Sequence, residues 1–504
     1  MKGACPDGGR LEIRPKLDEV RSLSESYNLI PVFHSYISDL ETPVSAFLKL
    51  GARKNSFLLE SAEQGERIGR YSFLGHEPRS TIIFRDGELI VSGADDETIA
   101  PSDDPFGAIE DHLARYRTPD IEGLPPFIGG AVGLFGYDLV RWVEELPPAG
   151  PDPLGVPDMA FMISDSIVIF DHLKHTILLL ANVLVEEGED IGEAYERACG
   201  RVRELKRLLD APLPRTEPCR RPPVAEPVSN FSRADFEAAV DRVKEYIFAG
   251  DSFQTVPSQR FSVDVDVSPF GIYRGLRTVN PSPYMYYIAF DDFTLVGSSP
   301  EPLIKVNRGL VETRPIAGTR PRGETPDEDR RLAEDLLSDE KELAEHIMLV
   351  DLGRNDLGRV CEPGTVEVVD LMRIEYYSHV MHIVSVVTGR LAGGRRATDA
   401  LKAAFPAGTV SGAPKIRSME IINELEPEKR GPYAGAIGYL SFSGELDTCI
   451  CIRTIVVKGG TAYVQAGGGV VADSVPAREY EETRNKARAL FSAIELAQGQ
   501  EDWE

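Results

Sequence analysis

Two segments of the sequence carry pairs of glutamates that could bind a metal ion together. In residues 473–497, a rotation of about 100° per residue puts Glu479 and Glu482 on one face of a predicted helix, with Lys486 beside them. Residues 328–351 place Glu342 and Glu345 on one side of a second predicted helix. Hard cations such as Mg²⁺ prefer such oxygen ligands. The spacing alone, however, favours ordinary solvent-exposed helix faces over a metal site.

These glutamates need helices whose other faces pack into a core. We expect the C-terminal helix to have Ser474 as its N-cap and Pro476 in its first turn. Its expected core stripe consists of Tyr480, Ala487, Leu490 and Ile494. The stripe of the second helix consists of Leu336, Leu343 and Ile347. Both pairs of glutamates would flank these buried stripes.

A run of three glycines precedes the C-terminal helix. Residues 461–474, TAYVQAGGGVVADS, predict a strand that leads into Gly467, Gly468 and Gly469 and then into the helix start. Bare backbone amides at such a place can bind an anion, although a glycine triplet alone is more often a tight turn. The run is not a GxGxxG fingerprint, and GTVSGAPK at 408–415 lacks the GK pair of a phosphate loop. Neither segment therefore supports a nucleotide-binding enzyme.

Two of the eight histidines lie in the segment EYYSHVMHIVSVVTG at residues 375–389. Alternation and β-branched content predict that residues 375–389 form a strand, in which His379 and His382 face opposite sides. This argues against a metal shared between them. One of them could act as an acid or base, and the competing interpretation is a packed histidine with satisfied hydrogen bonds.

Composition indicates a globular protein and excludes several partners. The 504 residues include 55 Lys and Arg against 81 Asp and Glu, a formal net charge of −26, which repels nucleic acid and anionic membranes. The longest apolar run, residues 176–185, is too short to span a bilayer, and the N-terminus lacks the apolar stretch of a signal peptide. The six cysteines show no CxxC pairing. We expect a soluble, cytoplasmic protein with reduced thiols.

A proline-rich segment at residues 211–230 divides the chain. Before it, residues 28–210 read mainly as antiparallel strands with a few helices, and after it, residues 231–495 mix helices and strands. The clearest element is a helix that begins after Ser232 and ends at Gly250. We find no repeat of fixed period.

Several motifs in a fixed order resemble the chorismate-utilising enzymes, and within them the large subunits of anthranilate synthase. They include LLES (58–61), NPSPYM (280–285), GSSPE (297–301), RPIAGTRPRG (314–323), AEHIMLVDLGRNDLGRV (344–360), YSHVMHIVS (377–385), FPAGTVSGAPK (405–415), GPYAGAIGY (431–439), IRT (452–454) and QAGGGVVADS (465–474). The resemblance implies an α+β fold with a four-layer α/β/β/α core and two orthogonally packed, mainly antiparallel sheets. Its catalytic region would be residues 231–495.

The resemblance also implies a cofactor and a set of site residues. Mg²⁺ would be bound by Glu345 and Glu482, with Glu342 and Glu479 beside them, and would contact the ring carboxylate of chorismate. The groups that would contact the rest of the substrate are Arg453, Tyr433, Gly467, Gly468, Gly469, Gly318, Thr319, Lys486 and Thr409. His382 would be the active-site histidine. A cation and several donors would then offset the two negative charges of chorismate in a strongly acidic protein.

Two positions distinguish this chain from its relatives and indicate the nucleophile. Isochorismate and salicylate synthases place a lysine that activates water where this chain has Gln254, and a neutral amide is a poor base. Aminodeoxychorismate synthases often place a nucleophilic lysine where this chain has Ala317. We therefore expect attack by ammonia at C2 and loss of pyruvate. The alternatives are an aminodeoxyisochorismate synthase, which keeps the pyruvyl group, and a catalytically inactive tryptophan-binding regulatory subunit.

The resemblance implies partners and a regulatory ligand as well. No glutaminase segment follows residue 490, so we expect ammonia to come from solution or from a separate glutamine amidotransferase subunit in a hetero-oligomer. L-tryptophan would inhibit by binding Glu60 and Ser61 of LLES together with Pro283, Tyr284 and Met285 of NPSPYM. Arg70 is the expected basic contact downstream of LLES.

Overall fold

Short alternating strands and tight turns build two large antiparallel sheets. The structure is a computed structural model that describes residues 11–51, 54–61, 69–93, 98–215, 217–377 and 380–503. A typical hairpin joins β4 (Ser80–Arg85) to β5 (Glu88–Gly93) through Asp86 and Gly87, whose φ values of 54° and 81° are those of a two-residue turn. Every strand pair in the two sheets is antiparallel, as the sequence predicts.

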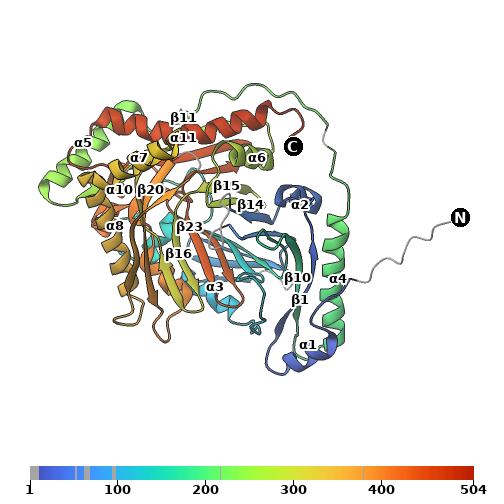
Figure 1. Cartoon of the computed structure of the whole chain (residues 1–504). Coiled ribbons are helices and arrows are strands. Elements are labelled where there is room, and N and C mark those ends of the chain that lie inside the picture. The colour runs from blue at the N-terminus through green and yellow to red at the C-terminus, as the bar shows by residue number, and fades with distance from the viewer. Residues whose placement is uncertain are drawn as a thin grey trace.

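The first sheet has eleven strands in the described part of the chain. Figure 1 labels some of them and shows how they lie relative to the helices. Its spatial order is β1 (Leu29–Ile37), β10 (Thr176–Leu184), β9 (Ser166–Asp171), β3 (Tyr71–His76), β2 (Ser56–Glu60), β14 (Tyr284–Ala289), β15 (Phe293–Ser299), β24 (Thr454–Lys458), β25 (Thr461–Gly467), β13 (Ser258–Asp264) and β11 (Val228–Ser229).

The second sheet has twelve described strands. Its order is β18 (Ile316–Pro321), β20 (Val380–Arg390), β17 (Leu310–Thr313), β16 (Pro302–Asn307), β23 (Leu446–Ile450), β22 (Ala436–Ser441), β7 (Gly130–Phe135), β8 (Met159–Ser164), β4, β5 and β6 (Thr98–Pro101), with β19 (Glu367–Tyr376) also paired to β20. A small separate pair consists of β12 (Gln254–Thr255) and β21 (Gly412–Ala413). Both large sheets combine strands from before and after residues 211–230, so neither half of the chain completes a sheet alone.

Helices cover the outer face of each sheet. The first sheet packs against α1 (Leu17–Ser24), α2 (Pro43–Leu50), α4 (Ile191–Leu209), α6 (Pro269–Val279) and α11 (Pro476–Gly499). The second packs against α3 (Pro105–Leu113), α8 (Glu340–Gly358), α9 (Ala397–Ala404) and the 3-10 helix η1 (Tyr137–Trp142). Two further helices, α5 (Arg233–Ala249) and α10 (Lys415–Leu425), pack together beside the start of α11.

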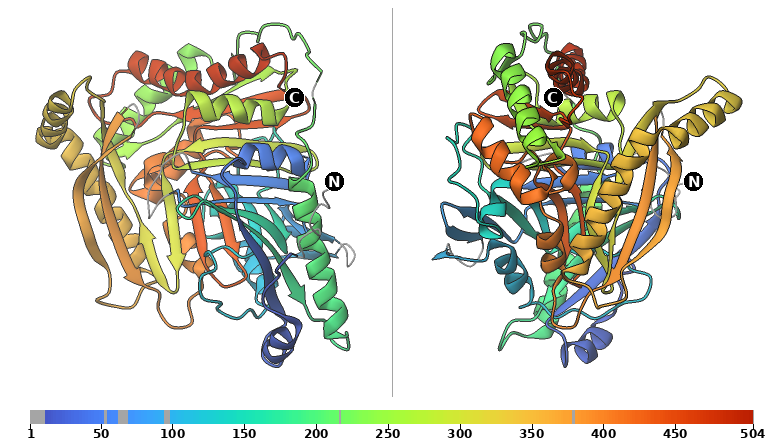
Figure 2. Two further views of the ribbon diagram at one scale, coloured as in Figure 1. Left: turned by 45° about the vertical axis from the view of Figure 1, so that its right-hand side comes forward. Right: turned by 90° about the vertical axis from the view of Figure 1, so that its left-hand side faces the viewer.

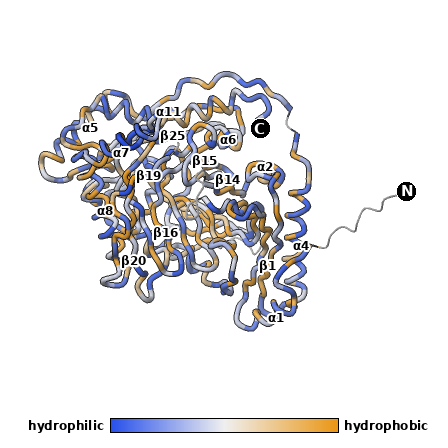
Figure 3. Tube along the Cα trace, viewed as in Figure 1, coloured by the Kyte–Doolittle hydropathy of each residue, from blue (hydrophilic) through white to orange (hydrophobic). Residues whose placement is uncertain are grey.

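A third cluster of buried side chains lies between the two sheets and completes the layers. Its members include Phe73 and Tyr286 of the first sheet, Tyr439 of the second sheet, and Phe127 from the loop before β7. The strands of the two sheets run in clearly different directions (Figure 2). Hydrophobic residues follow the strands, whereas the outer helices carry both hydrophobic and hydrophilic residues (Figure 3). The expected four-layer α/β/β/α architecture is confirmed. No helix in the described residues is long and apolar enough to cross a membrane.

Individual elements agree with the sequence in part. Helix α5 begins after Ser232, whose side chain accepts from the amide of Asp235, and ends at Gly250 with a φ of 85°, as predicted. The described residues in the range 211–227 form no helix or strand; Thr216 is not among the described residues. The use of residues 211–230 as a boundary between functional regions stays a prediction.

The single helix predicted over residues 328–351 is wrong. The structure has α7 (Pro326–Ser338) and α8, separated at Asp339, whose side chain accepts from the amides of Lys341 and Glu342 and so caps α8. This break turns the second helix about its axis relative to the predicted stripe. Leu336 is fully buried but Ile347 is 49% exposed, and His346 takes the buried position instead.

Two further predictions fail at element boundaries. The strand predicted over residues 375–389 is two strands, because β19 ends at Tyr376 and β20 begins at Val380, and His379 lies outside the described residues. Ser474 does not cap α11, whose N-cap is Val475, because the Ser474 hydroxyl accepts instead from the amide of Val471. Pro476 does stand in the first turn of α11.

A glycine allows α6 and α11 to approach closely. A Cβ atom at Gly275 of α6 would lie 2.4 Å from the carbonyl oxygen of Ala493 in α11. We predict that Gly275→Ala lowers the free energy of unfolding by about 1–3 kcal/mol, because the helices must separate to admit the methyl group. Denaturant unfolding followed by circular dichroism measures the change. Gly200→Ala in α4, where nothing lies within 4 Å, is the matched control and is expected to be neutral or stabilising. Equal effects of the two substitutions would contradict the packing argument.

Candidate active site

A cavity of about 240 Å³ lies where the two sheets and α11 meet. Its walls come from segments that are far apart in the sequence. Of the residues predicted from the sequence, it brings together Ala317, Thr319, His382, Thr409, Tyr433, Arg453, Gly467, Gly469 and Lys486. Gly318 and Gly468 adjoin these residues in the chain without lining the cavity, and the four glutamates and Gln254 also lie outside its lining.

Two cationic side chains face this cavity. Arg453 stands between β23 and β24 in a left-handed conformation with φ of 48°, and burial lowers the pKa of its guanidinium, against the influence of nearby Glu301. The ammonium of Lys486 donates to the carbonyl oxygen of Gly467 at 2.9 Å and pairs with Glu482 at 2.8 Å. The cavity is therefore suited to an anionic ligand.

Among the described residues, Glu301 is the only carboxylate in the cavity lining, and we did not predict it as a site residue. Burial raises its pKa from 4.5 to about 8, although the hydroxyl of Thr409, which donates to Oε1 at 3.0 Å, and the charge of Arg453 lower it. At neutral pH the carboxyl group consequently holds a proton. The sequence offered one signal for Glu301: it ends the GSSPE motif, two residues after the fully buried strand β15.

His382 in β20 is held as a neutral ring with a defined tautomer. Its Nδ1 lies 3.0 Å from the carbonyl oxygen of Gly318 and 3.0 Å from the hydroxyl of Thr319. Because a carbonyl oxygen only accepts, Nδ1 carries the proton and Nε2 keeps its lone pair. Burial lowers the pKa of His382, which the Gly318 hydrogen bond opposes and Arg453 reinforces.

The glycines let the backbone approach other groups closely. A Cβ atom at Gly467 would lie 2.7 Å from the hydroxyl of Tyr433, and one at Gly469 would lie 2.6 Å from Nε2 of Gln254. Any larger residue would displace these side chains. None of Gly467, Gly468 and Gly469 stands in a turn or has a positive φ, so the glycine run serves close contact and not the tight turn that a glycine triplet alone suggests.

The four glutamates lie at the N-terminal ends of α8 and α11. Lys341 of α8 and Asp473, just before α11, form an ion pair of 3.1 Å that links these ends. Glu345 accepts from Nε2 of Gln254 at 3.2 Å. Among the described residues, no three His, Cys, Asp or Glu side chains are already arranged to hold a metal ion.

The donor set nevertheless fits a hard divalent ion. Oε2 of Glu479 is buried and has no hydrogen-bond partner among the described residues. Burial raises the pKa of Glu479; the hydrogen bond with Ser474 opposes this shift and the charge of Glu482 reinforces it. Burial and the charge of Glu345 likewise raise the pKa of Glu342. A cation near these carboxylates would relieve both the burial and the repulsion.

A buried ion pair supports the cavity from behind. Arg430 forms two hydrogen bonds with Glu426, at 2.9 and 2.6 Å, and its guanidinium stacks over the rings of Tyr137 and Tyr433. The hydroxyl of Tyr433, in turn, approaches the backbone of Gly467. This fixes one wall of the cavity without exposing a charge.

A second, larger cavity of about 730 Å³ lies on the outer face of the first sheet. It brings together Glu60, Ser61, Arg70 and Met285, as predicted, but Pro283 and Tyr284 are not in its lining. Tyr284 projects to the opposite face of β14 and donates to Asp447 at 2.9 Å. The side chains of a β-strand alternate between faces, so Met285 and Tyr284 cannot share this cavity.

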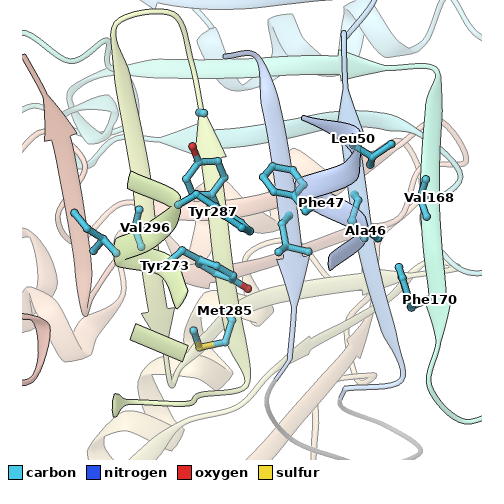
Figure 4. Close-up of a cluster of buried hydrophobic side chains, with 14 of the residues drawn as sticks. Ala46, Phe47, Leu50, Val168, Phe170, Tyr273, Met285, Tyr287 and Val296 are labelled. Atoms are coloured by element: carbon cyan, nitrogen blue, oxygen red, sulfur yellow. The ribbon is translucent and has the colours of Figure 1, made fainter. Parts of the chain in front are cut away.

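Helix α6 supplies further groups to the second cavity. Arg277 donates to Glu60 at 2.8 Å and lines the cavity, and the hydroxyl of Tyr273 also donates to Glu60. Figure 4 shows Tyr273 and Met285 side by side next to the buried cluster around Phe47. Arg70 is held by Asp171 through bonds of 2.9 and 3.2 Å. We did not predict Arg277 as a site residue, although it lies three residues before the start of NPSPYM.

Comparison with known proteins identifies the family. The chain belongs to the chorismate-binding enzymes, whose family model matches residues 54–492. Anthranilate synthase component 1 of Pseudomonas aeruginosa is 51% identical over 494 residues, which is 95% of this chain and 98% of that protein. The protein of the same name from Acetivibrio thermocellus is 48% identical over 489 residues, or 96% of this chain and 99% of that protein.

Solved structures agree with this assignment. Anthranilate synthase component I from Streptococcus pneumoniae superposes with a TM-score of 0.76 at 41% identity and covers 90% of this chain and 98% of that chain. The menaquinone-specific isochorismate synthase of Escherichia coli shares the fold at 17% identity, with a TM-score of 0.68 over 95% of this chain and 98% of its own. Enzymes of this family use a divalent metal ion.

We predict that Glu301 makes the stability of the protein depend on pH. Because its folded pKa is raised to about 8, the folded chain binds a proton that the unfolded chain releases above about 4.5, and stability falls as pH rises between these values. Glu301→Gln carries no titratable group at this position and should not show this loss. The free energy of unfolding of the variant minus that of the wild type should therefore rise by up to about 1.4 kcal/mol per pH unit and level off above pH 8. Urea unfolding at several pH values measures it.

The exposed Glu367→Gln in β19 is the control for this experiment. A difference between wild type and Glu301→Gln that stays constant from pH 5 to pH 8 would contradict the raised pKa.

Proposed function

We propose that the protein is an anthranilate synthase large subunit that catalyses the first step of tryptophan biosynthesis in the cytoplasm. In this reaction chorismate and ammonia give anthranilate, pyruvate and water. The observation that carries the proposal is one cavity that combines two cations, a protonated glutamic acid and a neutral histidine. These groups match the charges and proton transfers that the reaction needs.

The charges of the cavity support binding of a dianion. Arg453 and Lys486 face the cavity, and Glu301 adds no negative charge while it is protonated. We propose that Arg453, Tyr433 and the amides of Gly467 to Gly469 bind the pyruvyl side chain, with Gly318 and Thr319 nearby. The substrate would then be bound by local charge in a protein whose net charge is −26.

Glu301 and His382 are suited to opposite proton transfers. When the nitrogen of ammonia bonds to C2 and the C4–O bond breaks, the carboxyl of Glu301 gives its proton to the departing hydroxyl, which leaves as water. The new ammonium group returns a proton to the carboxylate of Glu301. Nε2 of His382 then takes the C2 hydrogen as a proton while the C3–O bond breaks, so the ring becomes aromatic and the side chain leaves as the enolate of pyruvate, which takes up a proton to become pyruvate. Thr409 orients Glu301 through its 3.0 Å hydrogen bond.

Two neutral residues favour ammonia as the nucleophile. Gln254 cannot activate water as a lysine would, and its amide is bound to Glu345. Ala317 lines the cavity and cannot form a covalent adduct. An aminodeoxyisochorismate synthase remains the second candidate and would be recognised by a product that keeps the pyruvyl group. An inactive regulatory subunit is disfavoured, because a disused cavity has no need for an acid, a base and two cations.

We propose Mg²⁺ as the metal ion. Glu345 and Glu482 would hold it, with Glu342 and Glu479 beside them, and the unpartnered Oε2 of Glu479 supports this choice. When bound, the ion would neutralise the ring carboxylate of the substrate and act as a Lewis acid.

We expect the isolated chain to form anthranilate from chorismate, Mg²⁺ and ammonium, but not from glutamine in place of ammonium. Relatives named component 1 imply a second component, and we propose that a glutamine amidotransferase subunit supplies ammonia to this chain. Fluorescence and mass of the product measure the reaction. Turnover with glutamine alone, or a product that keeps the pyruvyl group, would contradict this function.

Variants of α11 serve as controls for the metal in the same assay. Glu482→Ala removes a proposed ligand and should reduce turnover at least a hundredfold, whereas Glu495→Ala, on the exposed side of the same helix, should not. Equal activity of the two variants would reject the metal site but not the reaction.

We also propose that L-tryptophan inhibits the enzyme from the second cavity. Glu60 offers a carboxylate for the ammonium of an amino acid, Arg70 and Arg277 offer cations for its carboxylate, and Met285 offers an apolar wall. Tryptophan must bind better to a state that binds chorismate worse, so each ligand should weaken binding of the other.

Ser61→Phe is expected to fill this cavity and to raise the tryptophan concentration for half inhibition at least tenfold, with little change in uninhibited kcat. The reason is steric, because Ser61 lines the second cavity and not the catalytic one. Calorimetry and inhibition assays measure the effect. Undiminished inhibition of the variant, or no tryptophan binding to the wild type, would remove the proposed site.

A further inference from the structure

A small third cavity of about 20 Å³ lies directly behind the catalytic cavity. Tyr433 and Gln465 line both cavities, so the two cavities adjoin at these residues. The third cavity lies on the face of the first sheet that is turned toward the second, where Arg260 of β13 pairs with Gln465 of β25. Leu154, Arg430 and Tyr433 close it from the other side.

The size of this cavity suits one very small molecule. A cavity volume of roughly 10–15 Å³ is enough to hold one water molecule, and ammonia is of similar size. Cys451 is fully buried, and Val456 and Thr454 are 6% and 7% exposed, so the walls are well packed. A methyl group added to ammonia or to a side chain of the lining would fill the third cavity.

The charges around the cavity favour a neutral ligand over a cation. Arg260 and Arg430 line it, whereas none of the described residues lining it is an aspartate or glutamate. Their carboxylate partners, Glu428 and Glu426, do not reach the lining. Each guanidinium is already paired with its own carboxylate, so an ammonium ion would find no carboxylate in the described lining to pair with, whereas neutral ammonia needs none.

Gln465 is oriented to accept a hydrogen bond where the two cavities adjoin. Its Nε2 donates to the hydroxyl of Ser258 at 2.8 Å, and that hydroxyl donates to Glu426 at 2.8 Å. This fixes the amide, and its Oε1 accepts no hydrogen bond from a described residue. An N–H group can donate to Oε1 while the nitrogen lone pair stays available for attack.

We propose that the third cavity binds neutral ammonia immediately before it attacks the substrate, with Gln465 as the acceptor that positions it. The proposal rests on the proposed function and adds a binding site to it. The cavity selects by size and by charge, so it excludes both ammonium and amines larger than ammonia.

Cavity volume provides the test. Cys451→Val adds bulk to the wall and should raise the KM for ammonia at least tenfold, with the KM for chorismate unchanged. Cys449→Val is the matched control, because Cys449 is an equally buried cysteine that does not line the third cavity. Val456→Ile adds a single methylene and replaces Cys451→Val if that variant does not fold.

Enlarging the cavity gives the complementary result. Val456→Ala should accept methylamine and form N-methylanthranilate, which is detected by mass. The ratio of the rate with methylamine to the rate with ammonia should be at least tenfold higher in this variant than in the wild type. An unchanged ammonia KM in the filled variants, or an unchanged preference for ammonia over methylamine in Val456→Ala, would overturn the proposal. Absence of anthranilate from the wild-type enzyme with chorismate and ammonium would instead reject the proposed function itself.

Discussion

The buried ion pair between Arg430 and Glu426 holds the catalytic region together. Arg430 is 2% exposed and donates to the carbonyl oxygens of Val410 and Val256, which both line the catalytic cavity. Glu426 accepts from the backbone amide and the hydroxyl of Ser258. Removing one partner of such a pair typically costs about 3–5 kcal/mol, because the other charge stays buried without compensation. The pair therefore joins segments from β13, α10 and the 3-10 helix η2 (Gly408–Val410) around one cavity.

The same logic of compensated charge organises the rest of the site. Carboxylates gather at the N-terminal ends of α8 and α11, outside the lining of the catalytic cavity, while Arg453 and Lys486 face it. Glu301 is the exception, and burial keeps it protonated rather than charged. The cavity of this acidic protein is thus suited to an anion, because most nearby carboxylates lie outside its lining and burial neutralises Glu301.

The sequence predicted long periodic elements better than their ends. Helix α11 has its predicted core stripe because Tyr480, Leu490 and Ile494 follow one face without interruption. The prediction of a single helix over residues 328–351 fails because Asp339 caps a new helix. A side-chain hydrogen bond of this kind outweighs continuous periodicity. Most residues of the candidate site came from motif resemblance and do converge, but Glu301 and Arg277 did not stand out. Their roles depend on burial and on partners distant in the chain, which periodicity does not reveal.

The two larger cavities are connected by a pair of tightly packed helices. Tyr273 and Arg277 of α6 hold Glu60 in the second cavity, and Gly275 of the same helix lies against the backbone of Ala493 in α11. Helix α11 in turn carries Lys486 to the wall of the catalytic cavity. Because close-packed backbones leave no space to absorb a shift, a displacement of α6 must move α11 as well. A ligand that takes Glu60 from Tyr273 and Arg277 therefore acts on a helix that is coupled by contact to the catalytic cavity, which is the physical requirement for communication between the two sites.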